Sequence, residues 1–85
     1  MIDIARDEGL WVLTLNRPDK ANSVTKVMLT TLADTVEAAR AAGAAALVLT
    51  GAGKVFSAGA DLDDARAGLA TDPVWERLSA AVAGF

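Results

Sequence analysis

The sequence contains neither cysteine nor histidine. Without cysteine the chain can form no disulfide, no thiolate nucleophile, no cysteine-ligated zinc site and no iron–sulfur cluster. Without histidine it lacks the side chain that most often moves protons near neutral pH. Any acid–base chemistry must therefore come from carboxylates, lysines, backbone groups or residues outside this sequence, and we expect no metal site.

Positive charge is also scarce, because 8 Lys and Arg stand against 11 Asp and Glu, for a net charge of −3. The chain has no run of basic residues, which argues against binding to nucleic acid or to an anionic membrane surface. No apolar segment approaches the ~20 residues of a membrane span. Asp3 and Arg6 come too early for the apolar core of a signal peptide. We therefore expect a cytoplasmic protein with no nucleic-acid partner and no membrane partner.

The first half of the chain predicts a β-hairpin followed by a βαβ unit. Ile2–Ile4 and Leu10–Leu15 carry the strand-forming residues of the hairpin. Apolar residues then recur at spacings of three and four, from Thr25 as the N-cap of a helix to Gly43 just past its end. The continuous apolar run Ala44–Thr50 predicts a strand buried on both faces. A strand, a helix and a second strand in this order predict that the two strands are parallel.

The second half predicts two helices after a glycine-rich loop. The acidic segment Asp61–Asp64 suits the first turn of a short helix that ends at Gly68. Asp72 and Pro73 suit the start of a last helix, whose apolar stripe comprises Val74, Trp75, Leu78, Ala81, Val82 and Phe85. Nothing follows this stripe to pack on it. We therefore expect that the 85 residues are the truncated N-terminal part of a larger domain, since a chain of this length buries only roughly 60–65% of its unfolded surface.

The loop Gly51–Gly59 resembles two phosphate-binding motifs only superficially. A P-loop needs glycine where Val48 stands and Ser or Thr where Val55 stands, because those residues cradle phosphates and hold Mg²⁺. A dinucleotide fingerprint needs its third glycine at the position of Phe56. Both interpretations are therefore weak.

A third interpretation is an oxyanion hole made by a backbone amide. Ala58, Gly59 and Ala60 allow a sharp turn with little side-chain bulk, directly before the predicted helix start. Free N–H groups at such a corner, near the carboxyl end of a strand, can stabilise negative charge on an acyl oxygen. The same small residues are equally consistent with a tight strand–helix corner that binds nothing.

Two segments resemble motifs of the enoyl-CoA hydratase/isomerase (crotonase) superfamily. Leu15–Val24 reads LNRPDKANSV, and Phe56–Leu62 reads FSAGADL. Family members typically read LNRP-x-K-x-N-A-L and then G-x-G-x-x-F-(S/C/A)-A-G-A-D-L. Both motifs, their order and their spacing match, apart from Ser23, where Ala is the commoner residue. The resemblance covers essentially the whole sequence, but only the opening part of a typical member.

The resemblance implies an α/β fold built of ββα units, the spiral core of the ClpP/crotonase type, which is incomplete in this chain. Residues 1–85 would be the N-terminal part of such a domain. It implies a lyase or isomerase of fatty acid metabolism that acts on enoyl-CoA, with coenzyme A as part of the substrate and no prosthetic group. Family members usually form trimers or hexamers, so we also expect a homo-oligomer.

The resemblance also assigns roles to individual residues. The backbone N–H of Ala60 would be the first of two oxyanion-hole donors. The residues that would line the coenzyme A pocket are Ala58, Gly59, Asp61 and Leu62. Ala21 and Ser23 would contact the coenzyme A chain. Lys20 and Lys54 flank the two motifs and are candidates to meet its phosphates.

The second oxyanion amide and the carboxylates of family hydratases fall after Phe85. Asp61, Asp63, Asp64 and Glu76 do not match those carboxylates and are expected to be helix-start or surface charges. We therefore expect that the 85 residues alone are inactive. The alternative function is that of a non-catalytic, truncated homologue that binds coenzyme A weakly or associates with a full-length partner.

Overall fold

A computed structural model describes residues 1–85, the whole sequence. In chain order the elements are β1 (Ile2–Asp7), β2 (Leu10–Leu15), the 3-10 turn η1 (Pro18–Lys20), α1 (Lys26–Ala41), β3 (Ala46–Gly51), α2 (Leu62–Arg66), the 3-10 turn η2 (Leu69–Thr71) and α3 (Val74–Ala83). This order confirms the predicted hairpin, βαβ unit and C-terminal helices. None of the helices combines the length and the apolar character that crossing a membrane would need.

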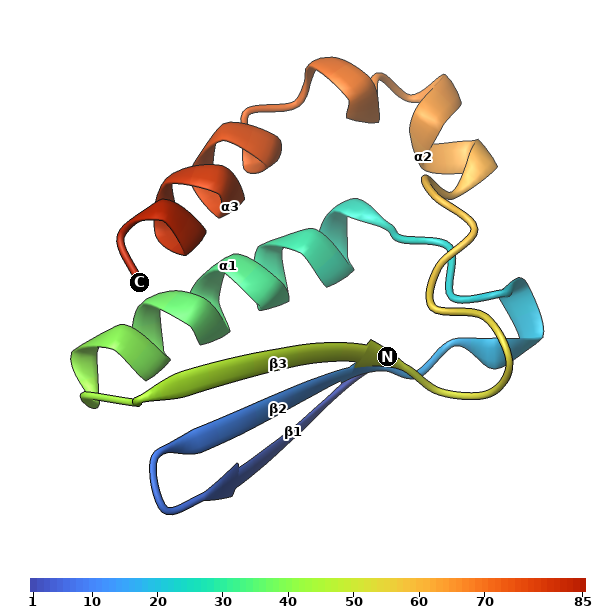
Figure 1. Ribbon diagram of the computed structural model, residues 1–85. Helices are drawn as coiled ribbons and strands as arrows, with labels where there is room; N and C mark the ends of the chain where they lie inside the picture. Colours follow the sequence, from blue (N-terminus) through green and yellow to red (C-terminus); the bar gives the residue numbers. More distant parts are fainter.

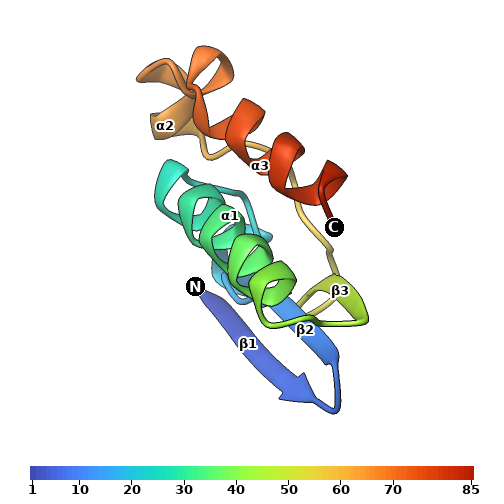
Figure 2. The ribbon, with the colours of Figure 1, turned by 90° about the vertical axis from the view of Figure 1, so that its left-hand side faces the viewer.

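The three strands form one sheet in the order β1-β2-β3. β1 and β2 are antiparallel, and β2 and β3 are parallel, as predicted, with Leu13 opposite both Ile4 and Leu49. Figures 1 and 2 show α1 lying over one face of this sheet and α3 packing against α1. The carboxyl ends of β2 and β3 therefore lie next to each other, at Leu15 and Gly51.

The core lies between β2 and α1. Alternate residues of β2 face the helix, because side chains alternate across a strand, and α1 presents residues three and four apart. The buried members of this core that come from β2 and α1 are Trp11, Leu13, Leu15, Met28, Leu29, Leu32, Val36 and Ala39. Full burial of one such large apolar side chain stabilises the fold by roughly 1.5–3 kcal/mol. Trp11 is 6% exposed and packs in this core.

Both ends of α1 are capped as the sequence predicts. The Thr25 hydroxyl oxygen accepts a hydrogen bond from the Met28 N–H at 3.1 Å. At the other end, Gly43 has a φ of +74°, and the N–H of Ala44 donates to the carbonyl of Ala39 at 2.9 Å. This is the long bond of a Schellman motif, which needs a left-handed residue where the glycine stands.

The prediction that residues 44–50 form a strand buried on both faces is wrong. The strand begins at Ala46, because the Ala44 N–H bonds to Ala39 in the cap at the end of α1. It pairs with β2 alone and forms an edge of the sheet, so that Val48 is 43% exposed and Leu49 48% exposed. An apolar run indicates that a strand can be covered on both faces, but of the large apolar side chains of β3 only that of Leu47 is partly buried against the core.

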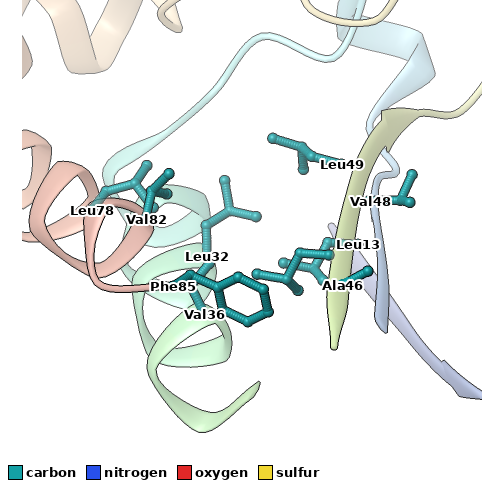
Figure 3. Close-up of a pocket in the computed structure, with 10 residues that line it drawn as sticks. Leu13, Leu32, Val36, Ala46, Val48, Leu49, Leu78, Val82 and Phe85 are labelled. Carbon is teal, nitrogen blue, oxygen red and sulfur yellow. The ribbon is translucent and has the colours of Figure 1, made fainter. Parts of the chain in front are cut away.

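The apolar side of β3 lines an open cavity of about 510 Å³ between the sheet, α1 and α3 (Figure 3). Its lining is entirely hydrophobic and consists of Leu13, Leu32, Val36, Ala46, Leu47, Val48, Leu49, Leu78, Val82 and Phe85. The predicted stripe of the last helix is therefore only partly covered. Val74 and Ala81 are buried against the core, whereas Val82 and Phe85 are exposed.

Polar contacts tie α3 to α1. Arg77 of α3 forms hydrogen bonds and ion pairs with Glu37 and Asp34 of α1. At the start of α3, Asp72 accepts a hydrogen bond from the Val74 N–H at 2.8 Å and pairs with Lys26 at 2.9 Å. Asp72 thus has the capping function that the sequence predicts, although the helix itself begins at Val74.

Gly51 ends β3 at a point where the chain folds back on itself. A Cβ at this position would lie 2.8 Å from the Phe56 Cα and would also clash with the Phe56 carbonyl oxygen. We expect Gly51→Ala to lower the free energy of unfolding by about 1–3 kcal/mol, because backbone must move to admit the methyl group. Urea denaturation measures this change.

Gly84→Ala is the matched control. The close neighbours of its Cβ would include the flexible end of the Arg40 side chain, which can move aside. We expect a change within about 0.5 kcal/mol. Equal stabilities of the two variants would contradict the close packing of the loop on β3.

Candidate functional site

The two predicted motifs meet at one end of the sheet. Residues 16–25 follow β2 and residues 52–61 follow β3, and the two segments run together at the right-hand side of Figure 1. The carboxyl ends of adjacent parallel strands are the usual position of ligand sites in α/β folds.

Short parallel pairing joins the two motifs. Val24 and Ala60 form an isolated parallel β-bridge. The Val24 N–H donates to the Gly59 carbonyl, and the Asp61 N–H donates to the Val24 carbonyl, both at 2.8 Å. The peptide units on either side of Ala60 are therefore both fixed by one residue of the first motif.

This pairing determines where the Ala60 N–H can point. The Gly59 carbonyl and the Ala60 N–H belong to one trans peptide unit, so they point in opposite directions. Because the carbonyl faces Val24, the N–H faces away from the first motif and donates no hydrogen bond within the chain. The neighbouring Gly59 N–H, by contrast, donates to the Ser57 hydroxyl at 3.1 Å. The bond that the Gly59 carbonyl accepts also polarises the unit and strengthens the free donor.

A surface pocket of about 440 Å³ lies at this position. Its lining consists of Lys20, Ser23, Ala58, Ala60, Asp61, Leu62, Asp63 and Arg66. The structure thus brings together most of the residues that the sequence predicts for the site, and adds Asp63 and Arg66. Two cationic and two anionic side chains line the pocket, so their formal charges sum to zero.

Three of the predicted site residues, Gly59, Ala21 and Lys54, do not line this pocket. Gly59 has a φ of +103°, and both its N–H and its carbonyl are bonded to the protein. Ala21 lines a separate pocket of about 220 Å³, together with Lys54. Ala21 is nevertheless adjacent to the site, because its carbonyl accepts from the Ala58 N–H at 2.9 Å.

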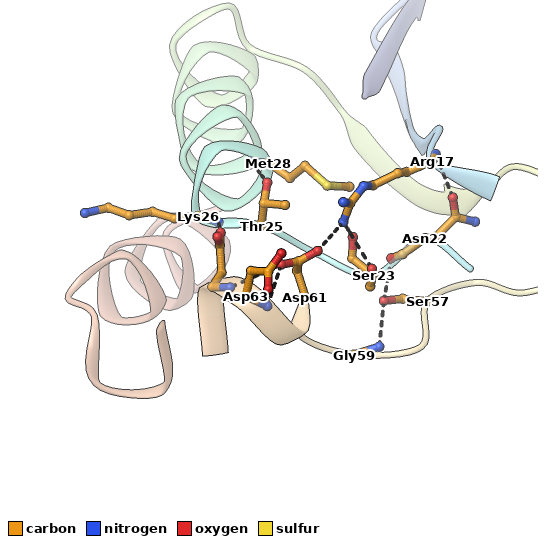
Figure 4. A network of polar contacts seen from close by, with 11 residues as sticks. Arg17, Asn22, Ser23, Thr25, Lys26, Met28, Ser57, Gly59, Asp61 and Asp63 are labelled. Atoms are coloured by element: carbon orange, nitrogen blue, oxygen red, sulfur yellow. Dashed lines mark hydrogen bonds and ion pairs between the residues drawn. The ribbon is translucent and has the colours of Figure 1, made fainter. Parts of the chain in front are cut away.

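Asn22 connects the two motifs, although its sequence position alone assigned it no role. Its side chain is fully buried and its φ is +54°. The amide oxygen accepts from the Arg17 N–H at 2.8 Å, and the amide nitrogen donates to the carbonyls of Ala52 and Val55 at 2.8 and 2.7 Å. Its backbone carbonyl accepts from the Ser57 hydroxyl (Figure 4). Two signals pointed to it: asparagine is enriched at positive φ, and Asn22 stands at the asparagine of the motif LNRP-x-K-x-N-A-L.

Asp61 begins α2 and also holds Arg17. One carboxylate oxygen accepts from the N–H groups of Asp63 and Asp64 at 3.0 and 3.1 Å. The other pairs with the Arg17 guanidinium at 2.9 Å (Figure 4). The hydrogen bond from Asp64 and then that from Arg17 lower the pKa of the Asp61 carboxyl from its ordinary value of 3.8. This confirms Asp61 as a helix-start charge, and an ionised carboxylate with these partners is not a proton donor.

The arrangement can therefore do one kind of chemistry with its backbone. A fixed, unpaired N–H beside small side chains can donate a hydrogen bond to an oxygen of a ligand and polarise it. No group of three or more Asp or Glu side chains is placed to hold a metal ion.

Comparisons with known proteins identify relatives of most of the chain. Residues 5–80 match the sequence profile of the family described as enoyl-CoA hydratase/isomerase. A Mycobacterium tuberculosis protein named "Probable enoyl-CoA hydratase EchA14" is 42% identical over 82 residues, which cover 93% of this chain and 31% of that protein. The 1,2-epoxyphenylacetyl-CoA isomerase of Escherichia coli is 42% identical over 59 residues, or 68% of this chain and 22% of that protein. The chain thus spans about a third or less of the length of the curated relatives it matches.

Solved structures agree with the fold. The enoyl-CoA hydratase EchA8_6 of Mycobacterium marinum matches with a TM-score of 0.80 and 35% identity, over 99% of this chain and 43% of that one. An enoyl-CoA hydratase/isomerase from Pseudoalteromonas atlantica matches with a TM-score of 0.80 and 29% identity, over 95% and 34% of the two chains. The predicted fold class, an α/β fold of the crotonase type, is confirmed.

Asn22→Ala tests the connection between the loops. The substitution leaves the Arg17 N–H and two loop carbonyls without partners inside the protein, and we expect it to lower the free energy of unfolding by roughly 2–4 kcal/mol. Asn16→Ala is the control, because Asn16 makes one exposed bond to Asp3 and should cost less than about 0.5 kcal/mol. Equal denaturation midpoints for both variants would contradict the role assigned to Asn22.

A second prediction concerns acid stability. Because the pKa of Asp61 is lower in the folded chain than its ordinary 3.8, ionised Asp61 stabilises the fold above that pH. This stabilisation is lost as the pH falls below 3.8 and through the folded pKa. We expect Asp61→Asn to be less stable than the natural chain at neutral pH, and the difference to close in acid. Urea midpoints across this range measure it, with Asp19→Asn as the control for loss of one charge; a constant difference would refute the prediction.

Proposed function

Because the chain belongs to the enoyl-CoA hydratase/isomerase family, we propose that it binds an acyl-CoA thioester and polarises the thioester carbonyl with the Ala60 N–H. The observation that carries this proposal is the direction of that donor. Ala60 lines the pocket, and pairing of its peptide unit with Val24 leaves the N–H without an acceptor in the chain.

The physical case for this donor is preorganisation. Negative charge develops on the thioester oxygen as an enolate or a related oxyanion forms. A donor that the fold already holds in place needs no rearrangement when that charge appears. Loss of one such donor typically lowers the rate ~100–1000-fold.

The same proposal places coenzyme A along the pocket. Ser23, Ala58 and the backbone of Asp61 and Leu62 would line the adenine and pantetheine side. Ala21 and Gly59 would support that wall, since Ala21 bonds to Ala58 and Gly59 bonds to Val24. Lys20 lies at the pocket and is the proposed contact for a phosphate. Coenzyme A is part of the substrate, and the proposal includes no prosthetic group.

The activity proposed for the whole protein is hydration or isomerisation of enoyl-CoA in fatty acid metabolism, in a cytoplasmic homotrimer or hexamer. The 85 residues would supply one oxyanion donor and coenzyme A contacts. Asp61 and Asp64 are bonded to backbone N–H groups at helix starts, which supports the expectation that acid–base chemistry comes from elsewhere. We propose that this chain alone does not turn over substrate.

The alternative is a module that binds coenzyme A without polarising the thioester, or that associates with a full-length partner. The apolar cavity beside β3 favours association, because it exposes Leu49, Val82 and Phe85. The two functions differ in one observable, the electronic state of the bound carbonyl.

Replacing Ala60 with proline tests the proposed donor. A ¹³C label in the carbonyl of a bound acyl-CoA should shift downfield with the natural chain. Ala60→Pro removes the N–H and should abolish most of that shift, while affinity for coenzyme A changes less. In an active full-length protein carrying this substitution, turnover should fall ~100-fold or more.

Two controls accompany this experiment. Ala60→Ser keeps the N–H and should keep the shift. A backbone ester at position 60 removes the N–H without a proline ring, so it separates loss of the donor from misfolding, which circular dichroism monitors. An unchanged carbonyl shift in the folded proline and ester variants would refute the role of Ala60.

A further inference from the structure

The Arg17 side chain lies where the two motifs meet. Its Nη1 donates to the Asp61 carboxylate at 2.9 Å, and to the carbonyl and hydroxyl oxygens of Ser23, both at 3.1 Å (Figure 4). The side chains of Arg17 and Asp61 are only 19% and 15% exposed. One partly buried guanidinium thus bonds to the first motif just before Val24 and to the second just after Ala60.

These contacts surround the peptide units that orient the Ala60 N–H. Val24 follows Ser23 and bonds to both units. Three sets of hydrogen bonds hold Asp61. Its backbone N–H donates to the Val24 carbonyl, and one carboxylate oxygen accepts from Arg17. The other carboxylate oxygen accepts from backbone N–H groups at the start of α2. Without the guanidinium, the Val24 bridge would be the only one of these contacts that still crosses between the two motifs next to Ala60.

We propose that Arg17 is a positioning residue that fixes the direction of the Ala60 N–H, by holding Ser23 and Asp61 on either side of the Val24 bridge. This inference rests on the proposed function of Ala60. An oxyanion donor acts only if it is already aimed at the oxygen, and a displacement of about 1 Å can cost ~100-fold in rate. Arg17 touches neither substrate nor reacting atoms in this role.

Substitution of the side chain isolates this role from the fold of the loop. The backbone of Arg17 has its own bonds, from its N–H to Asn22 and from the N–H groups of Lys20 and Asn22 to its carbonyl. These bonds do not involve the guanidinium. Arg17→Gln therefore removes the three hydrogen bonds of Nη1 and keeps the backbone hydrogen bonds of the turn.

The matched control is Arg77→Gln. Arg77 also forms hydrogen bonds and ion pairs with two acidic residues, but these lie between α3 and α1 and include no residue of either motif. A general loss of stability would affect both variants alike.

Amide hydrogen exchange of the 85-residue chain is the first measurement, and it needs no substrate. In Arg17→Gln, we expect exchange at the Val24 and Asp61 N–H groups to accelerate roughly 10-fold more than in the core of α1. Arg77→Gln should leave these two amides unchanged relative to that core. Arg17→Lys keeps the charge and should restore part of the protection.

The second measurement is the ¹³C carbonyl shift of a bound acyl-CoA. Arg17→Gln should reduce the shift while affinity for coenzyme A stays within about 3-fold. In an active full-length protein carrying the substitution, kcat should fall about 10- to 100-fold with little change in KM.

The outcomes separate the two proposals. If the natural chain gives no carbonyl shift, the proposed function fails, and the exchange experiment still decides whether Arg17 holds the bridge. If Arg17→Gln leaves the exchange of Val24 and Asp61 unchanged, or accelerates all amides equally, the positioning role is refuted. It is also refuted if bridge protection falls but the carbonyl shift stays intact.

Discussion

The site depends on two hydrogen bonds between Val24 and the peptide units that flank Ala60. They form because β2 and β3 are parallel neighbours, so that the segments after them leave the sheet at the same edge. In a parallel bridge one residue bonds to the neighbours of the other, so Val24 points its N–H and carbonyl toward the second motif, and Ala60 points its own N–H and carbonyl away from Val24. The free Ala60 N–H is therefore a geometric consequence of this isolated parallel bridge.

Other hydrogen bonds in the two loops hold this bridge in place, although no strand or α-helix connects the loops there. Irregular segments that lie partly buried need partners for every backbone N–H and carbonyl. Asn22 supplies three of these partners through one fully buried side chain, and Ser57 bonds to the Asn22 carbonyl and the Gly59 N–H. Buried polar connections of this kind allow few alternative arrangements, because a shift of one loop would leave several groups unpaired.

Periodic features of the sequence predicted the fold well, and local chemistry predicted the ends of the helices. Thr25, Gly43 and Asp72 act at the positions where their residue types favour capping. The coverage of β3 could not be predicted, since an apolar run does not reveal which elements lie nearby. Nor could the pairing of Val24 with Ala60 or the bonds of Asn22, because contacts between loops depend on how the strands bring them together. The motif resemblance indicated where a site is to be expected, and the structure gave the geometry of that region.

The lack of histidine and cysteine therefore says little about whether this segment takes part in chemistry. A backbone donor needs no reactive side chain. The residues around it contribute through their backbone conformation and their small size. Gly59 reaches a φ of +103°, which few other residues tolerate, and the alanines beside it leave the N–H uncovered. Asp61 and Arg17 are the only charged pair that joins the two motifs, and both are occupied in holding the loops. In such a site the side chains supply position, and the peptide bond supplies the hydrogen-bond donor.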